Sequence, residues 1–239
     1  MRIAIDHLTR MEKGHICFAG LDDAGHHIRP VLPGAQRLTT TLLARHGGVL
    51  DMANLVDLGG TGALPRPPAV EDTIFSPQNL ELVEALEPEL FWNLLSQNAS
   101  DSIHAIFGAE LKPREKGGWI VPEGQGKASL GGYRPATRPE VYLRRRGTEG
   151  KTRIRVRWRE GNKLFDLGVT DIRLHGDDHD TPDERLVKGA LERIEQGVEI
   201  LLGVGLTRPF SPDPEKEPAA HWLQVTNLHF KTNPVWRLG

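Results

Sequence analysis

The sequence has little of what would mark a secreted, membrane or thiolate-metal protein. Its 239 residues include one cysteine, Cys17, so no internal disulfide and no zinc site built from several thiolates can form. No run approaches the roughly 18 apolar residues that a membrane-spanning helix needs, and the first residues lack the apolar stretch of a secretion signal. We expect a soluble, cytoplasmic protein with no membrane partner.

Motifs of known catalytic and cofactor sites are also lacking. Neither GxGxxG nor GxxxxGK[ST] occurs, and GQGKAS (124–129) matches only the end of the second motif. No HExxH or nucleophile elbow is present, and the acidic run 177–180 lacks the spacing of a calcium loop. His26 and His27 are neighbours on a predicted strand, so they point to opposite faces and cannot chelate one metal. We predict no catalytic residue, no cofactor and no metal site, although the enzyme class stays open.

Positive charge is concentrated in one segment. The net charge of −2 and the pI near 6.6 exclude a generally basic, histone-like binder. Residues 138–163, however, carry 10 basic and 3 acidic side chains. Such a local excess indicates an anionic partner.

The first part of the chain reads as short strands followed by a helical insertion. Alternation and turn residues predict strands at 1–8, 15–22, 26–32 and 54–59, a short helix at 38–45, and further strands at 117–122 and 127–135. Between them, apolar residues spaced by three and four predict an amphipathic helical insertion over about 80–107, broken near Pro88 and Ser100.

The second part has the order strand, strand, strand, helix, strand, strand. The five strands of this order are predicted at 140–146, 151–159, 163–167, 198–206 and 221–229, with a further strand at 170–175 before the helix, which runs from Pro182 to Gln196 and is capped by Thr181. This is the order of a small OB-type Greek-key barrel, and the first part can be read in the same way. We therefore predict a mainly β chain with helical insertions (α+β), built as two tandem OB-like Greek-key barrels over residues 1–136 and 137–239.

The segment TRIRVRWRE (152–160) is the most informative. On a strand, its arginines point to one side while Ile154, Val156 and Trp158 point to the other. Guanidinium groups would then repeat about every 6.6 Å, which suits the phosphates of an extended nucleic-acid strand. The predicted nucleic-acid-binding residues are this row and its basic neighbours, Arg144, Arg146, Lys151, Arg153, Arg155, Arg157 and Arg159.

The alternative is a solvated sheet face on which these arginines pair with acids of neighbouring strands, such as Asp166 or Asp171. Aromatic platforms for unpaired bases are few. Trp119, Trp222, Trp236, Tyr133 and Tyr142 are the candidates, each of which could equally fill the interior. Basic character is therefore better supported than base stacking.

Several stretches resemble a known family. They include GHICFAGLD (14–22), HHIRPVL (26–32), VEDTIF (70–75), IVPEGQGKASLGGYRP (120–135), VTDIRLH (169–175), GLTRPF (205–210) and HWLQVTNLHF (221–230). Together they resemble the prokaryotic dual OB-containing domain family over nearly the whole chain. The resemblance implies two OB-like barrels that bind nucleic acid or a nucleotide-like ligand, in connection with prokaryotic conflict, defence or nucleic-acid processing.

The resemblance carries over no catalytic residue. Polar members of the matching stretches are candidates for a shared site, with Lys127 as an anion contact on the glycine-rich loop: Arg10, Arg29, Lys127, Arg208 and His221. The alternative role for the buried arginines among them is to pair with Asp57 or Asp171 and fix the contact between the barrels.

The sequence supports three hypotheses of function. The preferred one is a non-catalytic protein that holds the phosphate backbone of nucleic acid on the arginine-lined strand of the second barrel. The second is an accessory or scaffold module that binds a protein partner through its barrels and the insertion at 80–107. The third is a nucleotide-binding sensor or enzyme that uses Lys127 and the loop 123–132.

Overall fold

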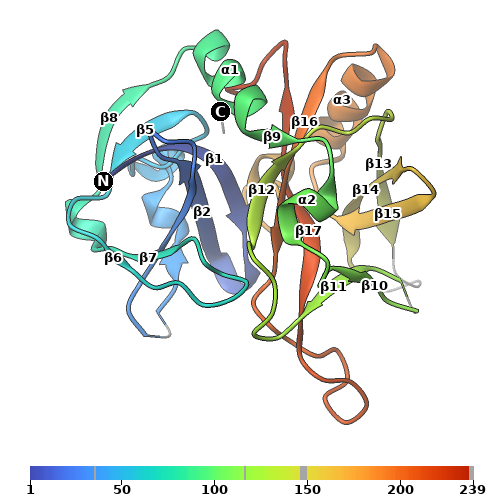
Figure 1. Ribbon diagram of the computed structural model, residues 1–239. Coiled ribbons are helices and arrows are strands. Elements are labelled where there is room, and N and C mark those ends of the chain that lie inside the picture. Colours follow the sequence, from blue (N-terminus) through green and yellow to red (C-terminus); the bar gives the residue numbers. More distant parts are fainter. Residues whose placement is uncertain (35, 116, 146–149, 237–239) are drawn as a thin grey trace.

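The computed structural model shows two β units side by side, the first from the N-terminal part of the chain and the second from the C-terminal part (Figure 1). The structure describes residues 1–34, 36–115, 117–145 and 150–236. The first sheet contains β1 (Arg2–Arg10), β2 (His15–Leu21), β3 (His27–Val31), β4 (Leu38–Thr39), β5 (Asn54–Asp57), β6 (Gly62–Ala63), β7 (Asp72–Ile74) and β8 (Glu81–Ala85).

Two further sheets make the second unit. One contains β9 (Ala99–Ser100), β10 (Lys112–Pro113), β11 (Trp119–Pro122), β12 (Leu130–Tyr133), β16 (Ile200–Leu206) and β17 (Ala220–Phe230). The other contains β13 (Glu140–Arg145), β14 (Thr152–Glu160) and β15 (Lys163–Gly168). A parallel bridge between Val169 and Val225 joins the end of β15 to β17.

Both units share one neighbour order. In the first unit the strands lie in the order β7-β3-β2-β1-β5, with β3 and β7 parallel. In the second they lie in the order β13-β14-β15-β17-β16, where the β15–β17 contact is again parallel. We number the five strands of each unit from 1 to 5 in chain order. Read as a closed ring, the neighbours in both units then follow the order 1-2-3-5-4. Both are thus curled, partly open sheets of one plan, as an OB-like pair requires.

The sheet pairing crosses the division of the chain that the sequence predicts after residue 136. Strands β11 and β12 precede that position, yet β11 pairs with β17 and β12 pairs with β16. The short β9 pairs with β12 in turn. The division into domains at 136 stays a prediction, but the hydrogen bonding places residues 99–133 with the second unit.

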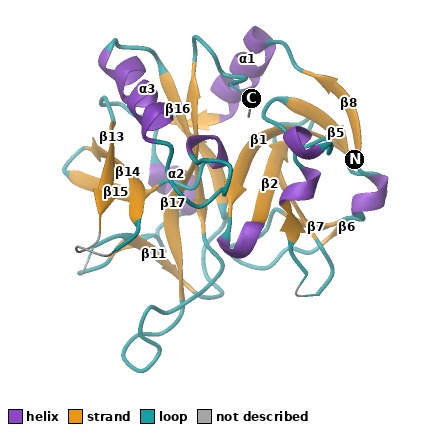
Figure 2. Cartoon of the chain, turned by 180° about the vertical axis from the view of Figure 1, so that it is seen from behind, coloured by secondary structure: helices purple, strands orange, loops and turns teal. Residues whose placement is uncertain are grey.

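Part of the predicted helical insertion is wrong. Residues 81–85 form β8, an edge strand that pairs with β5 and is exposed along its whole length. The helices of the insertion are α1 (Pro88–Asn98), which lies at the top of the molecule in Figure 2, and α2 (Ile103–Phe107), and they are separated by β9. Pro88 sits in the first turn of α1, where its missing N–H costs nothing.

Other short elements differ from the predictions. The segment 38–45 contains β4 and 3₁₀ turns at Thr40–Leu42 and Ala44–His46, since consecutive threonines disfavour an α-helix. The segment 170–175 contains a 3₁₀ turn, Ile172–Leu174, rather than a strand. Helix α3 (Glu184–Glu195) is capped by Asp183, not Thr181, whose hydroxyl bonds to Asp178 instead. The remaining 3₁₀ turns are Glu12–Gly14 and Pro77–Asn79.

Each unit has its own apolar core. The first is formed mainly by residues of β1, β2 and β5 with α1, and the second by β13 to β17 with α2 and α3. Within the second core Trp119, Phe165 and Trp158 stack in series, with ring centroids 4.5 and 5.1 Å apart. None of the described helices has the length and apolar character that crossing a lipid bilayer requires.

The contact between the units, which we call the seam, is polar and buried. Strands β1 and β17 approach each other there, and the Asn227 side-chain amide bonds to both backbone groups of Leu8, with Oδ1 accepting at 3.0 Å and Nδ2 donating at 3.2 Å. Beside them Asp171, fully buried, accepts from Arg173 Nε at 2.9 Å and from the Leu228 N–H at 3.0 Å. Arg173 lowers the pKa of Asp171 even though burial alone would raise it.

We expect Asp171→Ala to cost about 3–5 kcal/mol of unfolding free energy, because it leaves the Arg173 guanidinium buried without its carboxylate. Chemical denaturation measures this. Asp101→Ala is the control, since Asp101 pairs with Arg134 while 77% exposed and should change stability by less than about 0.5 kcal/mol. A loss at Asp171 as small as the control would show that this pair does not hold the seam.

Candidate functional site

The arginine row of β14 has the predicted alternation. Ile154, Val156 and Trp158 are buried, whereas Arg153, Arg157 and Arg159 are exposed and Arg155 is half-buried. The three-stranded sheet β13-β14-β15 therefore presents an outer basic face and an inner apolar one. The alternation is confirmed, because the period of a strand decides it.

Two arginines of the row are neutralised, which corrects the expectation of an unpaired line. The register places Arg157 opposite Glu140 on β13 and Asp166 on β15. Arg157 binds Glu140 Oε2 through its Nη2 at 2.5 Å, and Arg155 binds Asp166 Oδ1 through its Nε at 3.0 Å. The alternative of cross-strand ion pairs is thus correct for Arg155 and Arg157.

Other arginines of this face have no carboxylate partner among the described residues. Arg144 lies directly opposite Arg153, both are exposed, and among the described residues neither they nor Arg159 bind a carboxylate. Lys151 binds Asp180, outside the row. Arg146 lies outside the described residues. Like charges placed opposite each other on a sheet repel, so Arg144 and Arg153 together form a local anion-attracting spot.

Tyr142 is the aromatic side chain of this face. The Arg157 guanidinium lies 5.5 Å from its ring centroid, and its hydroxyl donates to Asp166 Oδ1 at 2.9 Å. Burial and this hydrogen bond raise the pKa of Tyr142. Of the other candidate platforms, Trp119 and Tyr133 are buried in the core. Trp236 lies against Arg173 and Arg193.

Trp222 borders a groove of about 580 Å³. Its ring stacks on Phe210 with centroids 5.5 Å apart, and the Arg114 guanidinium lies 5.0 Å from its centroid. Arg114 is itself paired with Glu217 in the same groove. Because Phe210 and Arg114 already contact the ring, Trp222 is a partly covered platform.

Two candidates for the shared site meet at one carboxylate. Arg29, buried on β3, donates to Asp72 Oδ1 at 2.6 Å, and Arg208, half-exposed after β16, donates to Asp72 Oδ2 at 2.7 Å. The neighbouring Glu71 accepts from the Ser129 N–H and hydroxyl, both at 2.7 Å. The prediction that such arginines pair with Asp57 or Asp171 was wrong. Their acidic partner is Asp72, which lies in the stretch VEDTIF (70–75).

The remaining candidates have separate surroundings. Arg10 donates to His175 Nε2 at 2.8 Å and to Asp180 Oδ1 at 2.9 Å. His221 Nδ1 lies 2.8 Å from the carbonyl oxygen of Thr207. Lys127 is exposed on its loop. Arg10 and the pair Arg29–Arg208 thus tie the two units together at different places.

A polar cluster that was not predicted from the sequence lies in the same seam. Asp6 and His7 are neighbours on β1, yet both are buried at the contact with β17. The β1–β2 register skips Asp6, since Ile5 pairs with Gly20 and His7 with Ala19. Such a bulge changes the direction in which side chains point. Two polar residues within an otherwise apolar strand were the feature of the sequence that could have revealed the cluster.

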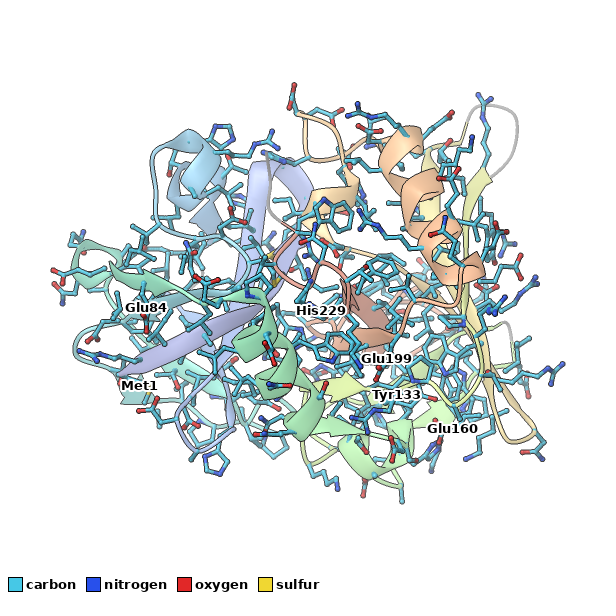
Figure 3. The ribbon with its side chains drawn as sticks, turned by 90° about the horizontal axis from the view of Figure 1, so that it is seen from above. Met1, Glu84, Tyr133, Glu160, Glu199 and His229 are labelled. Atoms are coloured by element: carbon cyan, nitrogen blue, oxygen red, sulfur yellow. The ribbon has the colours of Figure 1, made fainter. Side chains whose placement is uncertain are left out.

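His27 and His229 complete the cluster. His27 Nε2 lies 3.0 Å from Asp6 Oδ2, and His229 lies in the middle of the molecule (Figure 3). Burial lowers the pKa of His7 to about 4 and that of His229 to about 3, so both are neutral. Burial would also lower the pKa of His27, but the Asp6 carboxylate outweighs it and raises the value.

Comparison with known proteins places this geometry in a family. The family description "dual OB-containing domain" matches residues 1–228. The chain belongs to the dual OB-containing domain family. No curated protein matches the sequence.

The stretches that carry the family resemblance supply the seam of this dual OB-containing domain. They contribute Arg29 and Asp72, Ser129, Asp171 with Arg173, and Asn227 with His229. The arginine row of β14 lies outside these stretches. The family match over residues 1–228 includes the basic face as well as these seam residues up to Asn227.

His175 makes the seam sensitive to pH. Its Nδ1 faces the Asp171 carbonyl, which accepts, and its Nε2 faces Arg10 Nε, which donates, so the ring is neutral with its hydrogen on Nδ1. Burial and then Arg10 lower the pKa of His175 to about 4 from an ordinary 6.5. The unfolded chain therefore binds a proton more readily than the folded one, and stability falls as pH drops below about 6.5.

We expect the wild type to lose about 1 kcal/mol more unfolding free energy than His175→Gln between about pH 7.5 and about pH 5.5. Denaturant titrations of both proteins at the two pH values measure the difference. Other buried histidines titrate in both proteins, so their contributions to the pH dependence cancel in the comparison. An identical pH dependence of the two would contradict the neutral His175.

Proposed function

We propose that this dual OB-containing domain binds the phosphate backbone of single-stranded nucleic acid on the outer face of β13-β14-β15. The observation that carries the proposal is the set of exposed cations without a carboxylate partner among the described residues, Arg144, Arg153 and Arg159. OB folds use the face of their second and third strands for oligonucleotides. In the second unit these strands are β14 and β15.

The ion pairs set the strength of this site. With Arg155 and Arg157 held by Asp166 and Glu140, about three cations remain for phosphates. Binding should then weaken with salt at a slope of log K against log salt near −2, compared with about −3.5 for five contacts. Tyr142 is the aromatic side chain at hand, so sequence readout is weak and affinity is mainly electrostatic.

Charge reversal tests the face. We expect Arg153→Glu/Arg159→Glu to lower affinity for a single-stranded oligonucleotide at least about tenfold at low salt and to flatten the salt slope. Fluorescence anisotropy across a salt series measures both. Both side chains are exposed, so folding should be retained.

The matched control is Arg37→Glu/Arg66→Glu, which makes the same charge change at exposed positions of the first unit. An equal loss in both double variants would mean that net charge, not the β14 face, governs binding. Absence of any affinity in the wild type at low salt would refute the proposal.

A gain of affinity is a sharper test. Glu140 is 54% exposed and holds Arg157, so Glu140→Gln frees one more guanidinium for a phosphate. We expect tighter binding at low salt and a slope steeper by about 0.7. The same anisotropy series measures it, and unchanged binding would show that Arg157 does not face the nucleic acid.

One observation favours a protein-binding role as a second function. Strand β8 is an edge strand on which Leu82 and Val83 are 48% and 40% exposed, and Leu90 of α1, the next helix in the chain, is 58% exposed. Exposed apolar edge strands pair with other chains. A docking module of this kind would show no salt-dependent affinity for oligonucleotides, so the anisotropy series separates the two roles.

A further inference from the structure

Three buried polar atoms of the seam cluster have no hydrogen-bond partner among the described residues: Asp6 Oδ1, His7 Nε2 and His229 Nδ1. These three residues are at most 3% exposed. Buried polar atoms in folded proteins are nearly always satisfied, so several unsatisfied atoms at one place require a physical cause. Each of the three has a lone pair that a cation could use.

The ligand atoms have the spacing of a metal site. One atom each from Asp6, His7 and His27 lie within 4.8 Å of one another. Asp6 Oδ2 is 3.0 Å from His27 Nε2 and 3.4 Å from His7 Nε2. In a tetrahedral zinc site with bonds of about 2.0–2.2 Å, neighbouring ligand atoms are about 3.3–3.5 Å apart. The cluster is thus close to the size of one coordination sphere.

The backbone builds this arrangement from both units. The bulge at Asp6 turns it and His7 to the same side. A second bulge on β17 leaves Thr226 unpaired, and its Oγ1 lies 2.7 Å from His7 Nδ1. Metal-binding histidines are typically oriented by such a bond on the other ring nitrogen. Gly203 permits the approach, since a Cβ there would lie 3.1 Å from the His7 ring.

A small cavity of about 10 Å³ lies beside the cluster and is bordered by Asp6, His27 and His229. This is about the volume that one water molecule or ion occupies. His229 comes from β17 of the second unit, whereas Asp6 and His27 come from the first. A ligand held here would contact both units.

We propose that Asp6, His7 and His27 bind one Zn²⁺ ion in the seam, with His229, which borders the same cavity, as a further ligand. Two or three imidazoles with one carboxylate suit zinc and similar transition metals, whereas Ca²⁺ and Mg²⁺ require oxygen ligands. The ion fastens β1 and β3 of the first unit to β17 of the second. Its role is structural, because the ligands are buried.

The test titrates the full, chelator-treated chain with Zn²⁺ by calorimetry and follows thermal unfolding. We expect one ion per chain and a rise in Tm. His27→Gln should weaken zinc affinity by at least about 100-fold, and Thr226→Val, which frees the His7 ring, by about 10–100-fold. Absence of zinc binding to the wild type would overturn the proposal and leave a buried histidine–carboxylate network.

Two control variants locate the ion. His26→Gln removes the exposed neighbour of His27, whose side chain is 76% exposed, and should leave zinc affinity unchanged. His46→Gln removes the other close histidine pair, since His46 Nε2 lies 3.4 Å from His179 Nε2. If zinc binding is lost with His46→Gln and kept with His27→Gln, the ion binds elsewhere and the proposal is wrong.

A measurement on the wild type covers the case in which His27→Gln does not fold. Co²⁺ added in place of Zn²⁺ should give the intense visible absorption of a tetrahedral site, and an excess of Zn²⁺ should remove it. Weak absorption typical of octahedral Co²⁺ would indicate surface binding and would overturn the proposal.

Discussion

The pairing of β1 with β17 through side chains is the constraint on which the two-unit structure depends. Asn227 offers Leu8 the hydrogen bonds that a neighbouring strand would give, so the two strands meet without a shared ladder. The buried carboxylate of Asp171 accepts hydrogen bonds from Arg173 and from the Leu228 N–H. The Leu8–Asn227 hydrogen bonds form only when both units are in place, and for this reason the seam has one geometry and not a range of them.

The basic face and the seam differ in exposure and in role. The seam fixes the relative position of the units, whereas the arginines of the β14 face are exposed or half-buried and lie outside the apolar core. On that face the cross-strand register decides which arginines stay open, since Glu140 and Asp166 both lie opposite Arg157. The face is therefore a partly neutralised site whose strength individual acids can adjust.

Features set by period and element order were predictable from the sequence, whereas features set by register were not. The alternation along β14, the OB-like order and the family were predictable because none of them requires knowing which strands pair. The Arg157–Glu140 pair was not, since a single strand does not reveal which residue lies opposite. The cluster of Asp6 and His7 was missed because adjacent strand residues normally diverge, and a bulge is visible only once β1 is paired with β2. Residues 81–85 were misread because a five-residue apolar pattern fits a short strand and a helix alike.

The meeting of β1 with β17 also has a kinetic consequence. The contact joins residues more than two hundred positions apart, as Leu8 and Asn227 show. A ribosome releases β1 long before β17 is made, so the nascent first unit must keep Asp6 and His7 hydrated on an unfinished surface until the late strand arrives. Contacts of such long sequence separation carry a high loop-closure entropy cost, and a chain that stops short of β17 would leave this polar flank of β1 uncovered.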